Sequence, residues 1–215
     1  TLVAEVVAGE LGRLLGLPVP ELVLIGLDPV LGRSEPDAEL RDLILRSGGL
    51  NVGMDYLPGS FGFDTLDLRR TGAQLAARVV WFDAFVTNVD RTARNPNILL
   101  WHGEPWLIDH GAAVYVHHSW KDYLAKAASP FPAIKDHVLL PAAGEIPAAD
   151  AELAGRLDRA AFEAIVNVVP DDWLGGPPFE DVAREREAYV EYLSARLEAR
   201  ADFVEEAKRA RRQLI

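Results

Sequence analysis

The sequence has no cysteine, few lysines and no long apolar segment. Without cysteine, the chain can form no disulfide framework, no thiolate zinc site and no cysteine nucleophile. No apolar run approaches the ~18 residues that a membrane span needs. The first residues also lack the basic and then apolar pattern of a secretory signal. We therefore expect a cytoplasmic protein without a membrane partner.

Positive charge is also scarce. The 215 residues contain 22 Lys and Arg against 33 Asp and Glu, which gives a formal net charge of −11. Because a partner held through its phosphate backbone requires clustered cations, this balance argues against direct binding of nucleic acid. No lysine precedes Lys121, although arginines do. With 49% hydrophobic residues, a chain of this length can still bury a substantial core.

Hydrophobic periodicity near the start of the chain predicts helices and short strands. Residues 2–15 place apolar side chains at helical spacing, which predicts a helix. The β-branched and leucine-rich run 20–26 predicts a buried strand, and residues 51–57 predict an extended segment. The polar stretch 28–49 lies between them and contains Pro and Gly, so it predicts a loop with a short helix at 38–46.

The middle of the chain predicts a core helix followed by a hairpin. Apolar residues over 73–88 recur in helical steps, and the charged residues after them are unsuited to continuing the helix. Two short apolar runs, 98–101 and 106–108, are joined by turn residues and predict the hairpin. Trp101 and Trp106 flank that turn and could pack across it.

The remaining residues predict a helical region within one compact unit. Asp150 is placed to cap a helix whose apolar face continues to residue 168. A final helix is predicted over residues 180–212.

Polar residues that can carry chemistry flank the predicted hairpin. Asp90 and Asn95 lie five apart in the loop before it, and Asp109 follows its last strand. Because a hairpin brings its last residue back beside the residue that precedes its first strand, we expect Asp109 near Asn95. Two carboxylates and an amide oxygen that lie close together suit Mg²⁺, which takes its other ligands from water and substrate phosphates. This order is typical of kinase-type phosphoryl transfer, in which the loop carboxylate orients the acceptor hydroxyl and the other two residues hold metal.

Simpler interpretations compete with this one. Asp and Asn are common in loops because they cap and turn the chain, and the charged segment 90–94 could be a solvated, salt-bridged loop. A zinc site is a further alternative, since His110, His117 and His118 follow Asp109. Adjacent histidines on a regular strand point to opposite faces, however, so we favour ordinary hydrogen-bonded histidines over zinc.

Three segments of the sequence resemble the HipA-like kinases, distant relatives of the protein and phosphoinositide kinases. They are N-V-D-R-T-A-R-N-P-N-I-L-L at 88–100, W-L-I-D-H-G at 106–111 and A-E-V-V-A-G-E-L-G-R-L-L-G-L-P-V-P at 4–20. The resemblance covers most of residues 2–115, whereas the later helical part is similar only in general character.

The resemblance implies roles for four residues. Asp90 would be the catalytic aspartate, Asn95 and Asp109 would hold the metal, and Glu5 would be the glutamate of the small-lobe helix. The chain departs from related motifs at two positions. It has Thr92 where the family often has His, and His110 where protein kinases have Phe.

The resemblance also implies an α+β, protein-kinase-like two-lobed fold, with an incomplete small lobe and a mostly helical large lobe. Residues 1–50 would form the distal part of the small lobe, with its helix and the following strand. Residues 51–60 would form the hinge, and residues 61–215 the large lobe with the catalytic loop and the metal-binding hairpin. The residues expected to contact the nucleotide from the hinge are Asp55, Tyr56 and Leu57.

The function that we predict is ATP- and Mg²⁺-dependent transfer of the γ-phosphoryl group to a hydroxyl acceptor. The acceptor is open: a protein Ser/Thr or a small molecule. The alternative is a nucleotide-binding pseudokinase or regulatory interaction module without transfer activity. A metal-dependent phosphohydrolase is a third interpretation, but the sequence offers no obvious nucleophile arrangement for it.

The lysine distribution supports the alternative, because kinase-type sites pair a small-lobe lysine with the helix glutamate. Arg13 is the nearest following cation to Glu5, but it lies about 12 Å further along the same predicted helix. We therefore expect the lysine, and the strand pair that carries it, to lie outside these 215 residues, and this chain alone to show little transfer activity.

Overall fold

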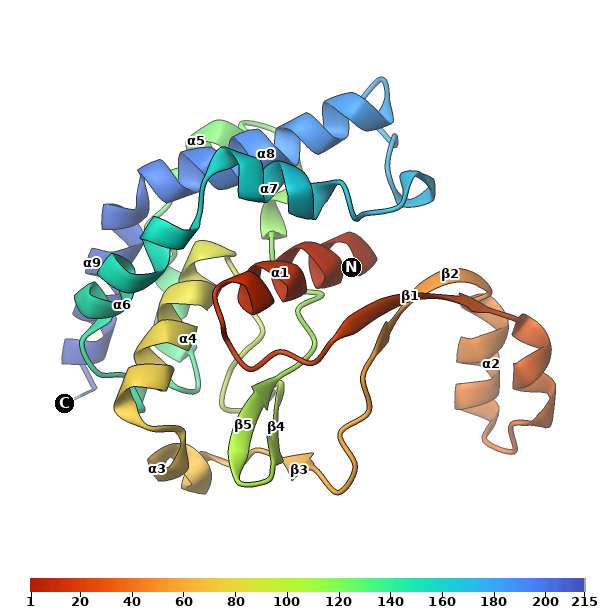
Figure 1. The fold of residues 1–215 in the computed structure, drawn as a ribbon, viewed down its shortest axis with the longest axis horizontal. Coiled ribbons are helices and arrows are strands. Elements are labelled where there is room, and N and C mark those ends of the chain that lie inside the picture. The colour runs from red at the N-terminus through yellow and green to blue at the C-terminus, as the bar shows by residue number, and fades with distance from the viewer. Residues whose placement is uncertain (215) are drawn as a thin grey trace.

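The computed structural model describes residues 1–214 and contains a helical body and a projecting arm (Figure 1). Ile215, the last residue of the predicted large lobe, lies outside the described residues. The fold is mixed, with helices predominating and two small antiparallel sheets, which agrees with an α+β class. The helices are α1 (Leu2–Leu14), α2 (Ala38–Arg46), α3 (Leu68–Thr71), α4 (Ala73–Phe85), α5 (Tyr123–Ala127), α6 (Ile146–Leu153), α7 (Arg159–Val166), α8 (Val182–Glu198) and α9 (Arg200–Arg212). The strands are β1 (Leu22–Leu27), β2 (Gly49–Met54), β3 (Phe61–Gly62), β4 (Ile98–Trp101) and β5 (Glu104–Leu107).

Helix α1 crosses the middle of the body beside α4 and below α7 and α8 (Figure 1). The predicted helix over 2–15 is confirmed, with its apolar stripe buried and its end at Leu14. Arg78 and Arg156 both donate hydrogen bonds to the carbonyl of Leu15, at 2.9 and 3.1 Å. Because these donors satisfy an otherwise open carbonyl, they fix the C-terminal end of α1 to the body.

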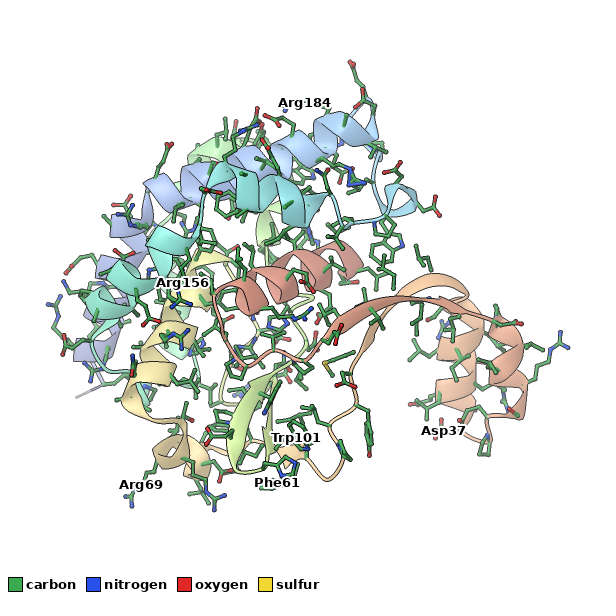
Figure 2. All side chains as sticks on the ribbon, viewed as in Figure 1. Asp37, Phe61, Arg69, Trp101, Arg156 and Arg184 are labelled. Carbon is green, nitrogen blue, oxygen red and sulfur yellow. The ribbon has the colours of Figure 1, made fainter. Side chains whose placement is uncertain are left out.

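The arm comprises residues 22–54 and contains β1, α2 and β2. Strands β1 and β2 pair antiparallel, with Leu22 opposite Met54 and Leu27 opposite Gly49. The predicted helix at 38–46 is confirmed as α2, and the carboxylate of Asp37 caps it by accepting two backbone N–H groups. The arm extends away from the body, with Asp37 on its far part (Figure 2).

The prediction that β1 is a buried strand is wrong. The strand forms at 22–27, but its four central residues are exposed, and α2 buries none of its side chains. The reason is that α1 packs only against the Leu22 end of β1 and leaves the four central residues uncovered, so the apolar sequence of this strand does not decide its burial.

The second sheet has the order β3–β4–β5 and includes the predicted hairpin. The hairpin turn is shorter than the sequence suggests, because β5 begins at Glu104 and only His102 and Gly103 connect the strands. Both turn residues have positive φ (51° and 85°), as a two-residue type I′ turn requires. Trp101 and Trp106 pack edge to face with ring centroids 5.3 Å apart, as predicted. Trp101 and Phe61 lie at the same end of this sheet (Figure 2).

The helices after residue 140 differ from the prediction at two breaks. Asp150 lies within α6 and caps no helix, and the chain leaves the helical conformation before Asp158. The carboxylate of Asp158 accepts the amide of Ala161 at 2.8 Å and starts α7 as a new helix. The predicted final helix is likewise divided, into α8 and α9, at Ala199.

The body is centred on α4, whose aromatic residues pack against the outer helices. The rings of Trp81 and Phe85 stack at 5.4 Å, and Phe85 stacks on Phe162 of α7 at 6.1 Å. Phe203 of α9 packs edge-on against Trp81. The core therefore holds fixed the C-terminal end of α4, after which residues 86–97 form a polar loop that leads to β4. Within residues 1–214, none of the helices combines the length and apolarity of a membrane crossing.

Candidate functional site

The polar loop after α4 brings Asp90 and Asn95 into contact. The side-chain amide of Asn95 donates to Oδ2 of Asp90 at 2.7 Å. The loop closes on itself between these residues, because the amide of Thr92 donates to the carbonyls of Asp90 and Asn95 at 2.8 and 3.1 Å. With its N–H group turned to Asp90, Asn95 keeps its Oδ1 atom as the oxygen that could bind a cation.

Asp109 lies beside the same loop because of the register of β4 and β5. The amide of Ile108 donates to the carbonyl of Asn97 at 3.0 Å, which places the residue after Ile108 next to the end of the loop. Asn97 joins the two parts of the site, since its Nδ2 atom lies 3.4 Å from Oδ2 of Asp90 and 3.4 Å from the carbonyl of Asp109. The structure therefore brings the two predicted carboxylates together through Asn97.

The sequence alone does not single out Asn97. Its only signal there is a second asparagine two residues after Asn95, immediately before a strand. In the structure Asn97 and Asp109 both adopt left-handed backbone conformations, with φ of 49° and 51°. Asn and Asp tolerate this region better than other side chains that have a Cβ, so the local chain path suits the residues at these two positions.

Glu5 approaches the site from α1 and is bound by the segment that follows Asp109. Its Oε2 atom accepts the amide of His110 at 2.6 Å, and its Oε1 atom lies 3.4 Å from Nδ1 of the His110 ring. His110 is buried, and its ring packs edge-on against Phe82. The residue that departs from the protein-kinase motif thus ties α1 to the predicted metal-binding segment.

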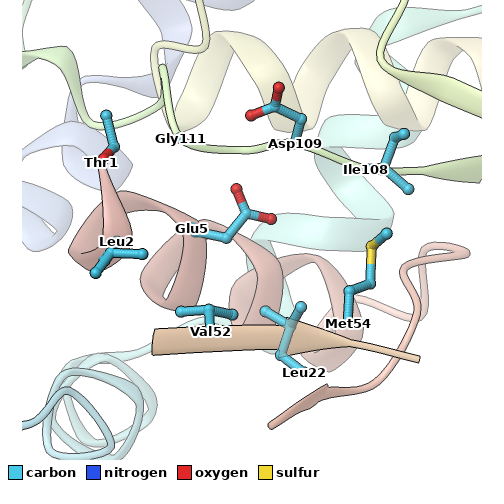
Figure 3. A pocket seen from close by; sticks show the side chains of 9 residues that line it. All are labelled: Thr1, Leu2, Glu5, Leu22, Val52, Met54, Ile108, Asp109 and Gly111. Atoms are coloured by element: carbon cyan, nitrogen blue, oxygen red, sulfur yellow. The ribbon is translucent and has the colours of Figure 1, made fainter. Parts of the chain in front are cut away.

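A cleft of about 360 Å³ opens between α1, the arm and the end of β5 (Figure 3). Glu5 and Asp109 line one side, and the apolar side chains of the arm line the other (Figure 3). Its size lies within the range of ligand pockets, roughly 300–1,000 Å³. The lining residues are Thr1, Leu2, Glu5, Leu22, Val52, Met54, Ile108, Asp109 and Gly111.

Gly111 leaves room next to both carboxylates. A Cβ atom at this position would lie 3.5 Å from Oδ1 of Asp109 and 3.8 Å from Oε2 of Glu5. A side chain there would therefore extend into the space that a bound group could occupy. The donor set, one carboxylate from Asp109 and the amide oxygen of Asn95, fits a hard cation such as Mg²⁺.

The protein offers this cation only part of its ligands. No group of three or more His, Asp and Glu side chains in the described part of the chain could enclose a metal ion. Phosphate oxygens and water would have to complete the coordination, as Mg²⁺ at nucleotide sites requires. None of the described residues that line the cleft has a basic side chain.

The residues predicted from the hinge do not line this cleft. Asp55 donates its amide to the carbonyl of Glu21 at 2.9 Å, the side chain of Tyr56 is exposed, and Leu57 is buried. Strand β2, which ends just before these residues, instead contributes Val52 and Met54, which the sequence does not distinguish from their neighbours. Nucleotide contacts by residues 55–57 stay a prediction.

The interpretation of residues 90–94 as a solvated loop is wrong for Arg91. Its side chain has no exposed surface, whereas Arg94 is exposed. The histidines that follow Asp109 make ordinary contacts: His117 lies 3.4 Å from the hydroxyl of Tyr189, and its ring packs against that of His118. Burial, with a smaller contribution from the charge of His118, lowers the pKa of His117 to about 4.

Comparison with known proteins identifies the family. The model of the HipA-like kinase family matches residues 1–200, which include the arm, the cleft and the polar loop. Neither the curated proteins nor the solved structures gave a match. Because the family match covers nearly the whole chain, the protein belongs to the HipA-like kinase family.

Proposed function

We propose that this protein transfers the γ-phosphoryl group of ATP to a hydroxyl acceptor with the help of Mg²⁺. The observation that carries the proposal is the contact chain from Asn95 through Asp90 and Asn97 to Asp109, beside a cleft that Glu5 also lines. Family membership supports the phosphotransferase class, and the arrangement of these side chains supports the roles that follow.

Asp90 is proposed as the group that orients and deprotonates the acceptor. Asn95 and Asn97 both approach Oδ2 of this half-buried carboxylate. Its Oδ1 atom then accepts the hydrogen of the acceptor hydroxyl. As the new bond from the hydroxyl oxygen to the γ-phosphorus forms, the bond from that phosphorus to the β–γ bridging oxygen breaks. The proton passes to Asp90 and ADP leaves.

Asn95 and Asp109 are proposed to hold Mg²⁺, through Oδ1 and the carboxylate respectively. When bound, this ion would neutralise negative charge on the phosphates. The residues of the chain contribute by position: Asn97 holds Asp90 and the backbone of Asp109 at a fixed separation, and Gly111 keeps space beside Asp109. Most of the rate gain would come from such positioning and from charge stabilisation.

The apolar side of the cleft is proposed to receive the adenine ring. Leu22, Val52 and Met54 supply that side. In this proposal residues 1–50 belong to the small lobe of a two-lobed kinase-like fold, residues 51–60 form the hinge and residues 61–215 the large lobe. The projecting arm (Figure 1) and the cleft that its side chains line support this division.

A second candidate, a nucleotide-binding pseudokinase or regulatory module, is favoured by one observation. In a kinase-type site the helix glutamate pairs with a lysine that also contacts the phosphates. Here, among the described residues, Glu5 contacts the amide and ring of His110, and the cleft lining has no basic side chain. This candidate would bind ATP without turning it over.

The replacement Asp90→Asn separates the two candidates and tests the proposed base. ATP binding and phosphoryl transfer are measured on the full encoded protein. The matched control is Asp172→Asn, because Asp172 is an exposed carboxylate in a short 3-10 helix and does not line the cleft. We expect Asp90→Asn to bind ATP normally and to lose about 10²- to 10⁴-fold in transfer rate, the usual contribution of a general base. Transfer at the wild-type rate would refute the role of this loop. ATP binding by the wild type without turnover would favour the pseudokinase.

A further inference from the structure

Arg91 lies behind the site and contacts both of its halves. The residue directly follows Asp90, and its Nε atom donates to Oδ2 of Asp83 at 2.6 Å. Its Nη1 atom donates to the carbonyl of Asn97 and lies 3.4 Å from the carbonyl of Ile108. One guanidinium therefore contacts the backbone at Asn97 and at the residue before Asp109.

Asp83 is a buried carboxylate in the last turn of α4, and three side chains donate to it. Oδ2 accepts from Arg91 and from Nε2 of His137 at 2.8 Å, while Oδ1 accepts from Nδ2 of Asn88 at 3.0 Å. Burial acts to raise the pKa of Asp83. The charge of Arg91 and the hydrogen bond from His137 outweigh that effect and hold the pKa well below its usual range.

Asn88 extends this network to Asp90. While its Nδ2 group donates to Asp83, its Oδ1 atom accepts the amide of Asp90 at 3.1 Å. A continuous path of hydrogen bonds thus runs from Asp83 through Asn88 to the backbone of Asp90. A second path runs from Asp83 through Arg91 to the backbone of Ile108.

His137 fixes the network from the opposite side. The amide of Leu139 donates to Nδ1 of His137 at 3.1 Å, so Nε2 carries the proton that Asp83 accepts. The backbone beside His137 also contacts the polar loop, because the amide of Val138 donates to the carbonyl of Arg91 at 3.0 Å. The segment at 137–138 therefore braces the polar loop against α4.

We propose that Asp83 and Arg91 are positioning residues that set the separation between Asp90 and Asp109. This inference rests on the proposed function and deepens it. Neither residue contacts the cleft, so neither is a catalytic residue. Their action passes through Asn88 to Asp90, and through the carbonyls of Asn97 and Ile108 to Asp109. A site that needs its carboxylates placed to within a fraction of an ångström depends on such support.

The planar guanidinium of Arg91 allows its contacts to the two carbonyls to be tested separately from its charge. Lysine in its place keeps the charge for Asp83 but presents a single ammonium group, which cannot reach the carboxylate and both carbonyls together. The matched control is Arg186→Lys. Arg186 is a half-buried arginine that likewise donates to two carbonyls, those of Val166 and Val169, and to the carboxylate of Asp171, but its hydrogen bonds reach neither α4 nor the polar loop nor the hairpin.

The experiment compares both variants in the full encoded protein. Melting temperature reports stability, calorimetry gives ATP affinity with and without Mg²⁺, and a transfer assay gives kcat and KM. For Arg91→Lys we expect kcat to fall at least about tenfold and the Mg²⁺-dependent gain in ATP affinity to shrink, with ATP affinity in EDTA unchanged. For Arg186→Lys we expect only a lower melting temperature.

Asn88→Ala provides a second test that leaves the ion pair intact and applies even if Arg91→Lys does not fold. We expect it to lower kcat without changing the Mg²⁺-dependent gain in ATP affinity. The replacement removes the hydrogen bonds of Asn88 to Asp83 and to the amide of Asp90, but it leaves Arg91 in contact with the carbonyls of Asn97 and Ile108. The inference is overturned if Asn88→Ala keeps the wild-type kcat, or if Arg91→Lys changes only the melting temperature. If Asp90→Asn is slow in the same assay, the proposed function still stands. Wild-type transfer by Asp90→Asn overturns both.

Discussion

The stability of the fold should depend strongly on the charge of Asp83. The replacement Asp83→Asn keeps the size of the side chain but leaves the guanidinium of Arg91 without an anion, where neither side chain has exposed surface. Deleting one partner of a buried pair costs about 3–5 kcal/mol of unfolding free energy. For chains of roughly 150–250 residues each kcal/mol lowers Tm by about 2–4 °C, so we expect a fall of roughly 6–20 °C.

The same residue should give the stability an acid dependence. The pKa of Asp83 in the folded state lies below its ordinary value because Arg91 and His137 outweigh the effect of burial. A carboxylate of this kind stabilises the fold above its unfolded pKa, about 3.9, and loses that contribution as the pH falls toward the folded pKa. We therefore expect the wild type to lose stability below about pH 4 through this group, and Asp83→Asn to lack that part of the dependence.

Urea unfolding followed by circular dichroism, at neutral pH and in acid, measures both effects. Asp172→Asn serves as the control, since it removes the same charge from an exposed position. A loss of less than about 1 kcal/mol in Asp83→Asn, the range of exposed ion pairs, would refute the reasoning. An unaltered acid dependence in that variant would show that Asp83 is not the group responsible.

Two further predictions concern ligand binding and turnover. Asp109→Asn should weaken ATP binding in the presence of Mg²⁺ but not in EDTA, because it removes a formal negative charge from the proposed metal site; equal affinities by calorimetry would make Asp109 a turn residue. The 215 residues alone should transfer phosphate slowly, since no lysine precedes Lys121 to pair with Glu5. Equal ATP turnover by this chain and the longest chain that its gene encodes would contradict that reason.

Local signals in the sequence predict much of the site. The five-residue spacing of Asp90 and Asn95 corresponds to a direct hydrogen bond. The hairpin after them returns Asp109 to Asn97, whose side chain also approaches Asp90. These relationships are readable because they depend on a short loop and a tight turn, whose geometry varies little.

The parts that the sequence does not predict depend on contacts between distant segments. Asp83 sits in an apolar helical pattern, and nothing near it in the sequence indicates that His137 reaches it from 54 positions away. The apolar spacing continues through Asp158 although the helix does not, because a capping hydrogen bond outweighs the periodicity there. The exposure of β1 also depends on which segments cover it, and its own residues do not specify that.

The hydrogen bonds between Glu5 and His110 have a mechanical consequence for the cleft. They join α1 to the segment after Asp109, and the two arginines at Leu15 fasten the other end of α1 to the body. One wall of the cleft is therefore rigidly built into the core. The opposite wall belongs to the arm, which projects from the body (Figure 1) and packs against it near the cleft through Leu22, beside Gly9 of α1, and through Val52. Any widening of the cleft to admit or release a ligand must accordingly come from displacement of the arm.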